Sequence, residues 1–200
     1  MIALIDYGSG NIRSVSKALQ REGADVRLVD SPDGLTNVNA VVLPGVGAFG
    51  DCVRNLTERK LWNPLKDWLG GGKPFLGICL GYQLLFESSE ETPGVEGFGF
   101  FRGKVKRFAD AGLKIPHMGW NTLELSDNPL WRGLPRDPYV FFVHSYFPVP
   151  QDDSIVTSRA IYGETFAASV GRGRIQAVQF HPEKSQSIGL TILKNFIASI

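Results

Sequence analysis

A cysteine held between two glycines is the first candidate for chemistry in this chain. Cys79 stands in the run Gly77-Ile78-Cys79-Leu80-Gly81, after the apolar residues 74–76 and before a helix-like segment. Small flanking residues permit the sharp turn from strand to helix that presents a nucleophile above the edge of a sheet. The free N–H groups at the start of the following helix would favour thiolate over thiol. A buried structural cysteine is the competing interpretation, because free cysteines are often core residues.

A histidine and a carboxylate follow much later, at the end of the apolar run 175–178. His181 and Glu183 are two residues apart, so on an extended backbone they project to the same side. Glu183 could then orient the imidazole while the other ring nitrogen faces the Cys79 sulfur, as a base faces its nucleophile. A solvated surface pair is one alternative. A zinc site made of these three residues is another, although the paired ligand spacing of structural zinc sites is missing.

A third candidate is the turn Pro44-Gly45-Val46-Gly47, which ends the apolar run 40–43. A strand that ends in glycines leaves backbone amides uncovered, as an oxyanion binder requires. The Val46 amide, together with that of Leu80, could therefore hold the oxyanion of a tetrahedral intermediate. An ordinary tight turn is the alternative.

Together these segments resemble the class I, or triad, glutamine amidotransferases. The resemblance rests on Gly77-x-Cys79-x-Gly81-x-Gln83 followed by His181-Pro182-Glu183. Within that class, four segments look like the glutaminase subunits of imidazole glycerol phosphate synthases, and they extend the resemblance over essentially the whole chain. They are Ile5-Asp6-Tyr7-Gly8-Ser9-Gly10-Asn11, Pro44-Gly45-Val46-Gly47, Pro116-His117-Met118-Gly119-Trp120-Asn121 and Phe180-His181-Pro182-Glu183-Lys184-Ser185. Most relatives in the wider class carry a second glycine where Val46 stands.

The resemblance implies a three-layer, flavodoxin-like α/β fold with a largely parallel central sheet and an antiparallel β addition. It also implies hydrolysis of L-glutamine to L-glutamate and ammonia by Cys79, His181 and Glu183 through a cysteinyl thioester. The ammonia would pass within a heterodimer to a β/α-barrel cyclase subunit that makes imidazole glycerol phosphate and AICAR in histidine biosynthesis. No cofactor and no metal are expected.

The same resemblance assigns binding roles around the triad. Substrate glutamine is expected near Gly47, Gln83, Glu91, Ser145 and Tyr146. The partner interface is expected at Asn11, Arg13, His117, Met118, Trp120 and Lys184. Trp120, in a Gly-Trp-Asn segment expected to be a loop, suits an interface anchor, with core packing as the alternative. His117 could instead be a satisfied loop histidine. Gln83 could instead be a helix-surface amide, and His144 is predicted to be a structural histidine rather than a catalyst.

Val46 leads to a regulatory hypothesis. A β-branched residue resists backbone conformations that glycine accepts, so turning its amide toward the oxyanion should be unfavourable in the isolated subunit. Docking of the partner, loaded with its own substrate, could supply the missing free energy. Such coupling would suppress wasteful hydrolysis of glutamine.

Three other functions fit parts of the pattern. The first is a triad amidotransferase subunit that serves another synthase, for example for anthranilate or pyridoxal phosphate. The second is a γ-glutamyl peptidase, for which Glu183 is the wrong third member. The third is a non-catalytic interaction subunit or thiol sensor that uses Cys79. A nicotinamide cofactor is disfavoured, because Arg13 stands where a dinucleotide fingerprint needs its third glycine.

Composition narrows the class of protein. With 200 residues, 43% of them hydrophobic, the chain is predicted to form one domain over residues 1–200. A net charge of +1 without a run of Lys or Arg disfavours nucleic-acid binding. No apolar stretch approaches the roughly 20 residues that span a bilayer, and the first residues lack the basic start of a signal peptide. A cytoplasmic protein with Cys52 and Cys79 as free thiols is therefore expected.

Short apolar runs alternate with amphipathic segments in the first half of the chain, which predicts a βαβ progression and a parallel sheet. Strands are expected at Ile2–Asp6, Asp25–Val29, Ala40–Leu43 and Phe75–Cys79, followed by an antiparallel group at Gly94–Val105, Thr122–Leu125, Tyr139–Val143, Ile155–Ser158 and Phe166–Val170. A first helix is expected to begin after Asn11, whose side chain can cap it. A second is expected over Cys52–Leu69, with an interruption near Pro64. A last helix is expected to place these apolar residues on one face: Ile188, Ile192, Leu193, Phe196, Ile197 and Ile200.

Overall fold

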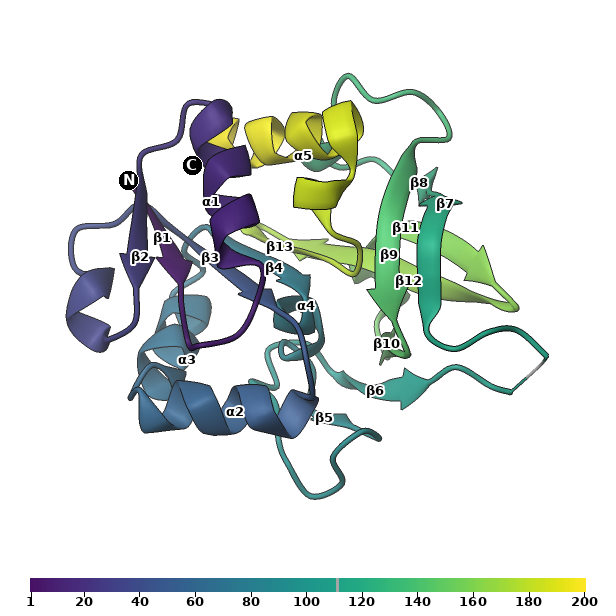
Figure 1. The fold of residues 1–200 in the computed structure, drawn as a ribbon, viewed down its shortest axis with the longest axis horizontal. Coiled ribbons are helices and arrows are strands. Elements are labelled where there is room, and N and C mark those ends of the chain that lie inside the picture. The colour runs from purple at the N-terminus through teal and green to yellow at the C-terminus, as the bar shows by residue number, and fades with distance from the viewer. Residues whose placement is uncertain (111) are drawn as a thin grey trace.

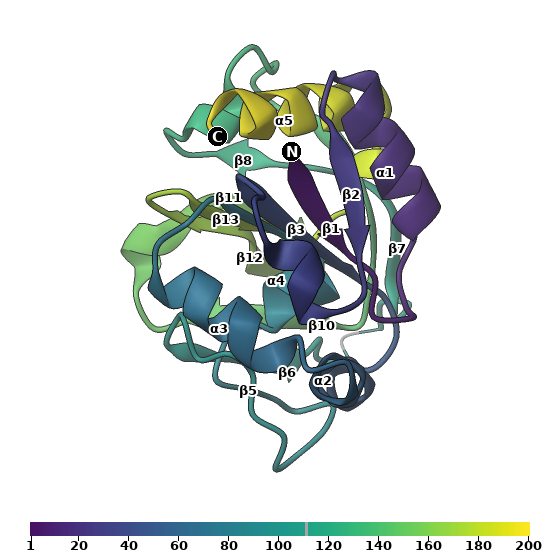
Figure 2. The same cartoon turned by 90° about the vertical axis from the view of Figure 1, so that its left-hand side faces the viewer.

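A central β-sheet lies between two pairs of helices, which gives the fold three layers (Figures 1 and 2). The computed structural model describes residues 1–110 and 112–200. Helices α1 (Ile12–Arg21) and α5 (Gln186–Ala198) cover one face of the sheet, and α2 (Phe49–Glu58) and α3 (Trp62–Gly70) cover the other. Both chain ends lie on the side of the molecule that carries α1 and α5.

Eight strands form the central sheet, in the order β2-β1-β3-β4-β13-β12-β11-β8. The first five in this order run parallel: β2 (Val26–Val29), β1 (Ile2–Ile5), β3 (Ala40–Gly45), β4 (Phe75–Cys79) and β13 (Ile175–Val178). The last three are antiparallel: β12 (Glu164–Arg172), β11 (Val156–Tyr162) and β8 (Glu124–Leu125). The predicted parallel sheet with an antiparallel addition is confirmed.

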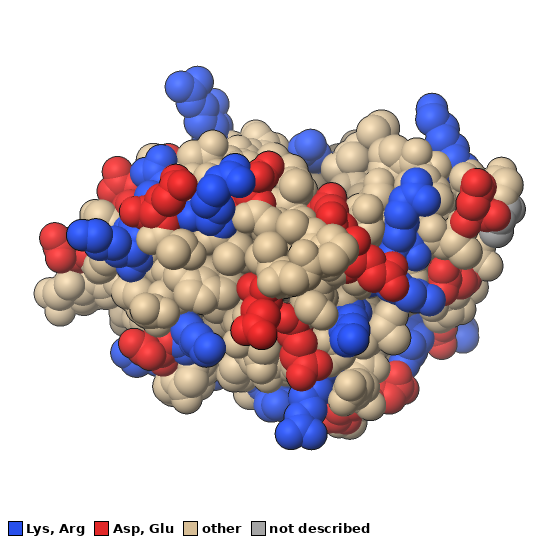
Figure 3. Space-filling view, turned by 90° about the horizontal axis from the view of Figure 1, so that it is seen from below, with Lys and Arg blue, Asp and Glu red and all other residues tan. Residues whose placement is uncertain are grey.

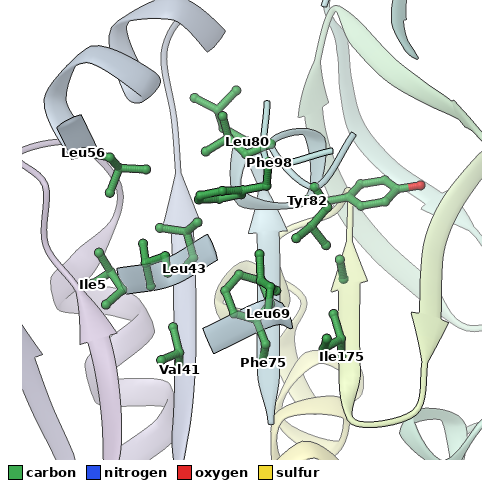
Figure 4. Packing of buried hydrophobic residues seen from close by; sticks show 14 of the residues in the cluster. Ile5, Val41, Leu43, Leu56, Leu69, Phe75, Leu80, Tyr82, Phe98 and Ile175 are labelled. Carbon is green, nitrogen blue, oxygen red and sulfur yellow. The ribbon is translucent and has the colours of Figure 1, made fainter. Parts of the chain in front are cut away.

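Side chains of the parallel strands alternate between two hydrophobic clusters, as the period of two in a strand requires. Ala3 and Ile5 of β1 pack in the cluster formed with α2 and α3, part of which Figure 4 shows. Ile2 and Leu4 pack in the opposite cluster, with residues of α1 and α5. Both faces of the sheet are thus buried, which is why its strands are continuous apolar runs in the sequence.

Two small sheets accompany the central one. The first contains β5 (Ser88–Ser89), β6 (Gly103–Arg107) and β10 (Tyr146–Pro150). The second pairs β7 (His117–Thr122) with β9 (Tyr139–His144). The expectation that all later strands join the central sheet is therefore wrong for these segments.

Several predicted strand boundaries also differ from the structure. Of the predicted strand 94–105, only the residues from Gly103 onward are strand, and the apolar side chains of Phe98 and Phe101 enter the core from a loop. The predicted strand 122–125 is divided between the end of β7 and the two residues of β8. Strand β10 was not predicted, because Pro148 and Pro150 are residues that sheets tolerate mainly at edges.

The helices differ from prediction in three details. The helical conformation is interrupted at residues 59–61, between α2 and α3, and not at Pro64. Pro64 lies in the first turn of α3, where a missing N–H costs no helical hydrogen bond. Asn11 precedes α1, but its side chain makes no capping bond. Ile200 lies beyond the end of α5 and is exposed. Five single turns complete the described elements: α4 (Leu80–Gln83) and the 3₁₀ turns η1 (Pro32–Leu35), η2 (Pro129–Trp131), η3 (Asp153–Ile155) and η4 (Pro182–Lys184).

Charged side chains of both signs are interspersed over the face of the molecule that Figure 3 shows. This agrees with the near balance of acidic and basic residues in the sequence. Within residues 1–110 and 112–200, no helix has the length and apolar character needed to cross a membrane.

Candidate functional site

Cys79 ends β4 on a strained backbone. Its φ of 54° and ψ of −105° lie outside the regions that non-glycine residues ordinarily adopt, a cost on the order of 1–3 kcal/mol. The flanking glycines make the turn sterically possible: a Cβ on Gly77 would lie 2.6 Å from the carbonyl oxygen of Gly81, and one on Gly81 would lie 1.9 Å from that of Leu43. The predicted sharp turn is confirmed. The helix behind it is shorter than expected, since α4 has four residues and its dipole can contribute little.

The carboxyl ends of three neighbouring strands converge beside Cys79. In the register of the sheet, Gly45 of β3 pairs with Cys79, and Val178 of β13 pairs with Ile78. The turn after β3 and the segment after β13 therefore flank the cysteine on either side. Open parallel sheets commonly bind ligands at this edge.

His181 and Glu183 meet in a buried pair. His181 precedes the 3₁₀ turn η4, so the backbone between the two is not extended as expected, yet the turn brings their side chains together. His181 Nδ1 lies 2.9 Å from Glu183 Oε1, and the two side chains are 2% and 1% exposed. His181 Nε2 is buried without a hydrogen-bond partner among the described residues. The carboxylate therefore holds the Nδ1 side of the ring and leaves Nε2 available.

The charge state of His181 depends on Cys79. Burial alone would lower the pKa of His181, but the Cys79 thiolate and the Glu183 carboxylate act in the opposite direction and raise it to about 10. The imidazole is accordingly protonated at neutral pH. A thiolate–imidazolium pair supplies both a nucleophile and a proton for a leaving group.

A cavity of about 250 Å³ opens in front of the Cys79 side chain. All the residues expected to bind substrate or oxyanion line this cavity: Val46, Gly47, Leu80, Gln83, Glu91, Ser145 and Tyr146. Pro116, Val143 and His144 also line it and were not predicted to do so. The cavity thus joins the Cys79 motif to the Val46 turn, and the His181–Glu183 pair lies beside Cys79 without lining the cavity.

Two polar side chains of the cavity are fixed by the protein itself. Gln83 is 4% exposed and its Nε2 donates to the Tyr146 carbonyl at 2.9 Å, so it is not a helix-surface amide. Glu91 Oε2 accepts the backbone N–H of Phe49 at 2.8 Å, at the start of α2. His144 is buried and lies 2.9 Å through Nδ1 from the Tyr146 carbonyl, as expected of a structural histidine.

Two contacts at the site were not foreseen from the sequence. Gln179 Nε2 lies 3.7 Å from the Cys79 sulfur, and Ser9 Oγ donates to the Val46 carbonyl at 2.6 Å. Gln179 left a usable signal, because it stands two residues before His181, next to an apolar strand. Ser9 left none, since its partner is 37 residues away along the chain.

The residues expected at a partner interface fall into two groups. Met118 is 64% and Trp120 is 46% exposed on β7, so core packing of Trp120 is excluded. Arg13 and Lys184 are exposed, and Asn11 is half-buried.

His117 is the exception among the expected interface residues. It is 3% exposed and its ring stacks on those of Phe142 and Tyr162. The segment expected as a loop is strand β7, in which neighbouring side chains point to opposite faces. The prediction of His117 as an interface residue is therefore wrong.

Both cysteines are free thiols, as predicted, and Cys52 is buried on α2. Over residues 1–110 and 112–200, no group of three or more His, Cys, Asp or Glu side chains is arranged to hold a metal ion. The triad positions therefore do not form the zinc site considered as an alternative.

Comparison with known proteins agrees with this geometry. Residues 3–200 match the family model described as "Glutamine amidotransferase class-I". The chain is 52% identical to "Imidazole glycerol phosphate synthase subunit HisH" of Thermosynechococcus vestitus (strain NIES-2133 / IAM M-273 / BP-1), over 100% of this chain and 97% of that protein. The protein of the same name in Syntrophotalea carbinolica (strain DSM 2380 / NBRC 103641 / GraBd1) is 48% identical, over 98% of each chain.

Solved structures share the fold at lower identity. "Crystal structure of glutamine amidotransferase" superimposes with a TM-score of 0.79 at 19% identity, over 100% of this chain and 98% of that one. "Structure of PurLQS from Thermotoga maritima" does so with a TM-score of 0.75 at 23% identity, over 100% and 96%. At these identities the likeness concerns the fold alone.

Proposed function

The chain belongs to the class I glutamine amidotransferase family, and from that premise we propose that it is the glutaminase subunit of an imidazole glycerol phosphate synthase in histidine biosynthesis. It hydrolyses L-glutamine to L-glutamate and ammonia. The full-length identity of about half to the HisH proteins supports this choice within the family. The observation that carries the activity is the buried His181–Glu183 pair beside Cys79, whose side chain lines the cavity.

In the proposed mechanism, the Cys79 thiolate attacks the carboxamide carbon of glutamine. The backbone N–H groups of Val46 and Leu80 bind the oxyanion that forms. The His181 imidazolium gives its proton to the departing nitrogen, so that ammonia and a cysteinyl thioester result. A water molecule then attacks the thioester and loses a proton to His181, the sulfur leaves as thiolate, and glutamate is released.

Glu183 and the cavity residues have supporting parts in this proposal. Glu183 keeps Nδ1 of His181 as a donor, so that Nε2 is the nitrogen that exchanges protons with the reaction. Gly47, Gln83, Glu91, Ser145 and Tyr146 hold the substrate. Their common position on the wall of the cavity supports this assignment.

The partner in this proposal is a β/α-barrel cyclase subunit, in a heterodimer. Its docking face is the exposed side of the β7–β9 sheet with Asn11, Arg13 and Lys184. On that side Met118 pairs with Val143 and Trp120 with Phe141, and Val143 also lines the cavity. The apolar face therefore continues to the mouth of the site, which supports direct transfer of ammonia to the partner. We place the reaction in the cytoplasm as part of the same proposal.

The test is glutamate release from glutamine by the purified chain, alone and with an equimolar cyclase subunit and its nucleotide ligand. We expect strong activation only with both present. Cys79→Ala should abolish turnover and leave the fold intact, because it removes the nucleophile. Cys52→Ala is the matched control, since it removes the other buried cysteine, and it should retain most of the activity. Substantial glutaminase activity in Cys79→Ala would overturn the proposal.

A non-catalytic thiol sensor is the rival from another class. The buried His181–Glu183 pair argues against it, because a sensor has no use for an oriented base. Labelling with a glutamine-like electrophile separates the two functions. A glutaminase should react with it far faster than with an electrophile of equal reactivity that lacks the amino-acid part, whereas a sensor should show no preference.

A further inference from the structure

The reacting sulfur has a side-chain neighbour outside the triad. Gln179 follows β13 directly and is completely buried, at 0% exposed. Its backbone N–H donates to the Ala168 carbonyl at 2.8 Å, which holds this residue against β12. Its side-chain Nε2 lies 3.7 Å from Cys79 Sγ, within reach of a hydrogen bond to sulfur.

The orientation of the Gln179 amide is set by a chain of contacts. The chain starts at the Tyr146 carbonyl, which can only accept, so Gln83 must turn its NH₂ group toward it, at 2.9 Å. The same NH₂ group donates to Gln179 Oε1 at 3.2 Å. Gln179 is left with its own NH₂ group facing the Cys79 sulfur.

The reverse orientation of either amide is unfavourable. Turning over Gln83 would set its oxygen against the Tyr146 carbonyl. Turning over Gln179 would set its NH₂ group against that of Gln83 and its oxygen against the thiolate. Such unmade hydrogen bonds between buried groups carry the full cost of desolvation. Gln83 and Tyr146, which line the substrate cavity, therefore fix the orientation in which the Gln179 NH₂ group faces the Cys79 sulfur.

We propose that Gln179 is a further catalytic residue, whose side-chain amide donates to the Cys79 thiolate and stabilises it, with Gln83 as the residue that positions the amide. A role of Gln179 in glutamine hydrolysis rests on the proposed function of the chain as a glutaminase. Hydrogen bonds to charged groups are stronger than those between neutral groups. The sulfur is anionic before attack and again when the thioester is cleaved, so Gln179 acts at both points.

The chain offers a matched control. Gln176 lies on β13, the strand that Gln179 follows, and is also buried. Its amide oxygen accepts from Asn128, and its amide NH₂ group donates to the Gly173 carbonyl. Among the described residues, no hydrogen bond joins its side chain to Cys79. Gln176→Met and Gln179→Met thus remove the same buried amide, and only the second removes a donor from the sulfur.

The experiment measures the rate of alkylation by iodoacetamide against pH, which requires no glutamine chemistry. Burial raises the pKa of the Cys52 thiol to about 12, so labelling below pH 9 reports on Cys79. We expect Gln179→Met to move the midpoint of the profile upward by about one pH unit, which corresponds to a tenfold smaller thiolate population below the midpoint. Gln176→Met should leave the midpoint unchanged.

An unchanged midpoint in Gln179→Met, or an equal change in Gln176→Met, would overturn the inference. If Gln179→Met does not fold, Gln83→Met replaces it, since that change leaves Gln179 in place but removes its orientation, and the midpoint should again move upward. In the assay with the cyclase subunit, Gln179→Met should lower kcat by about tenfold with KM for glutamine little changed. Failure of the proposed function would instead appear as glutaminase activity that survives Cys79→Ala.

Discussion

The hydroxyl of Ser9 donates to the carbonyl of Val46 at 2.6 Å, and this bond ties the loop after β1 to the turn after β3. A second contact joins the same two segments, because a Cβ on Gly45 would lie 2.6 Å from the hydroxyl of Tyr7. The backbone that carries the proposed oxyanion donor is thus hydrogen-bonded to Ser9 and closely packed against Tyr7. The Val46 carbonyl belongs to the peptide after Val46, so the Ser9 bond restrains the Val46 N–H, in the peptide before it, through the backbone of Val46 itself.

The first prediction concerns this bond. Ser9→Ala should raise the glutaminase rate of the isolated chain by about three- to tenfold, the range that corresponds to the loss of one hydrogen bond. The rate with the cyclase subunit and its ligand should change much less. Ser199→Ala is the control, since it also removes a hydroxyl that donates to a backbone carbonyl, that of Phe196 at 2.7 Å. A basal rate equal to that of the unaltered protein would show that Ser9 does not restrain the turn.

The second prediction concerns Val46 itself. Among the four residues of its turn, only Gly47 has a positive φ. If the peptide before Val46 turned over, the φ of Val46 would become positive as well. This costs roughly 1–2 kcal/mol for a residue with a Cβ and little for glycine. Val46→Gly should therefore raise the partner-independent rate by about tenfold. Val46→Ala keeps the Cβ, so an equal rise in that variant would assign the effect to lost packing and contradict the hypothesis.

The third prediction concerns the ion pair at the site. Burial works to lower the pKa of His181, and the Cys79 thiolate is the strongest influence that raises it. In Cys79→Ala the pKa of His181 should fall from about 10 by about one to three, the range of a close opposite charge. Titration of the imidazole by NMR measures this directly, with Cys52→Ala as the control. An unaltered titration would mean that the sulfur carries no charge beside His181.

The parts of the site that could be predicted from the sequence are those whose geometry depends on a short segment alone. Gly77 and Gly81 are spaced to permit the strained turn at Cys79, and that requirement is local. Parallel strands were readable because both of their faces are buried. By contrast, whether the His117 side chain is buried or exposed depends on the pairing of β7 with β9, which cannot be predicted from one segment alone. The position of Gln179, two residues before His181, was visible in the sequence, but its role was not, because that role follows from Gln83 and Tyr146, which lie far away along the chain.

The fourth prediction concerns the proposed docking face. Trp120 is 46% exposed, and its ring lies 6.0 Å from that of Phe141, centroid to centroid. Trp120→Ala should weaken binding of the cyclase subunit by about 30-fold, as truncation of a central interface aromatic typically does. Leu28→Ala is the control, because Leu28 is 55% exposed on β2 at the far edge of the central sheet. Calorimetric titration measures both, and equal affinities would place the interface elsewhere.

The fifth prediction concerns the two buried histidines beside the cavity. His144 Nδ1 donates to the Tyr146 carbonyl, so its Nε2 must accept from His117 Nδ1 at 3.0 Å, and His117 Nε2 is left to accept from Asn121 at 3.3 Å. Burial lowers the pKa of His117 to about 4 and that of His144 to about 3. Both rings are therefore neutral at pH 7, and a proton added to His144 would set two N–H groups against each other.

The sign of the resulting pH dependence follows from proton binding. Below pH 6.5 the two histidines take up protons in the unfolded chain but not in the folded one, so stability falls as pH decreases from about 6.5 to about 4. The slope is about 1.4 kcal/mol per histidine for each pH unit. His181 does not add to it, because its raised pKa leaves it protonated in both states below pH 6.5. Urea unfolding at pH 6.5, 5.8 and 5.0 measures the slope, and His117→Gln should reduce it by about half. A variant with the full slope would mean that His117 titrates normally in the folded protein.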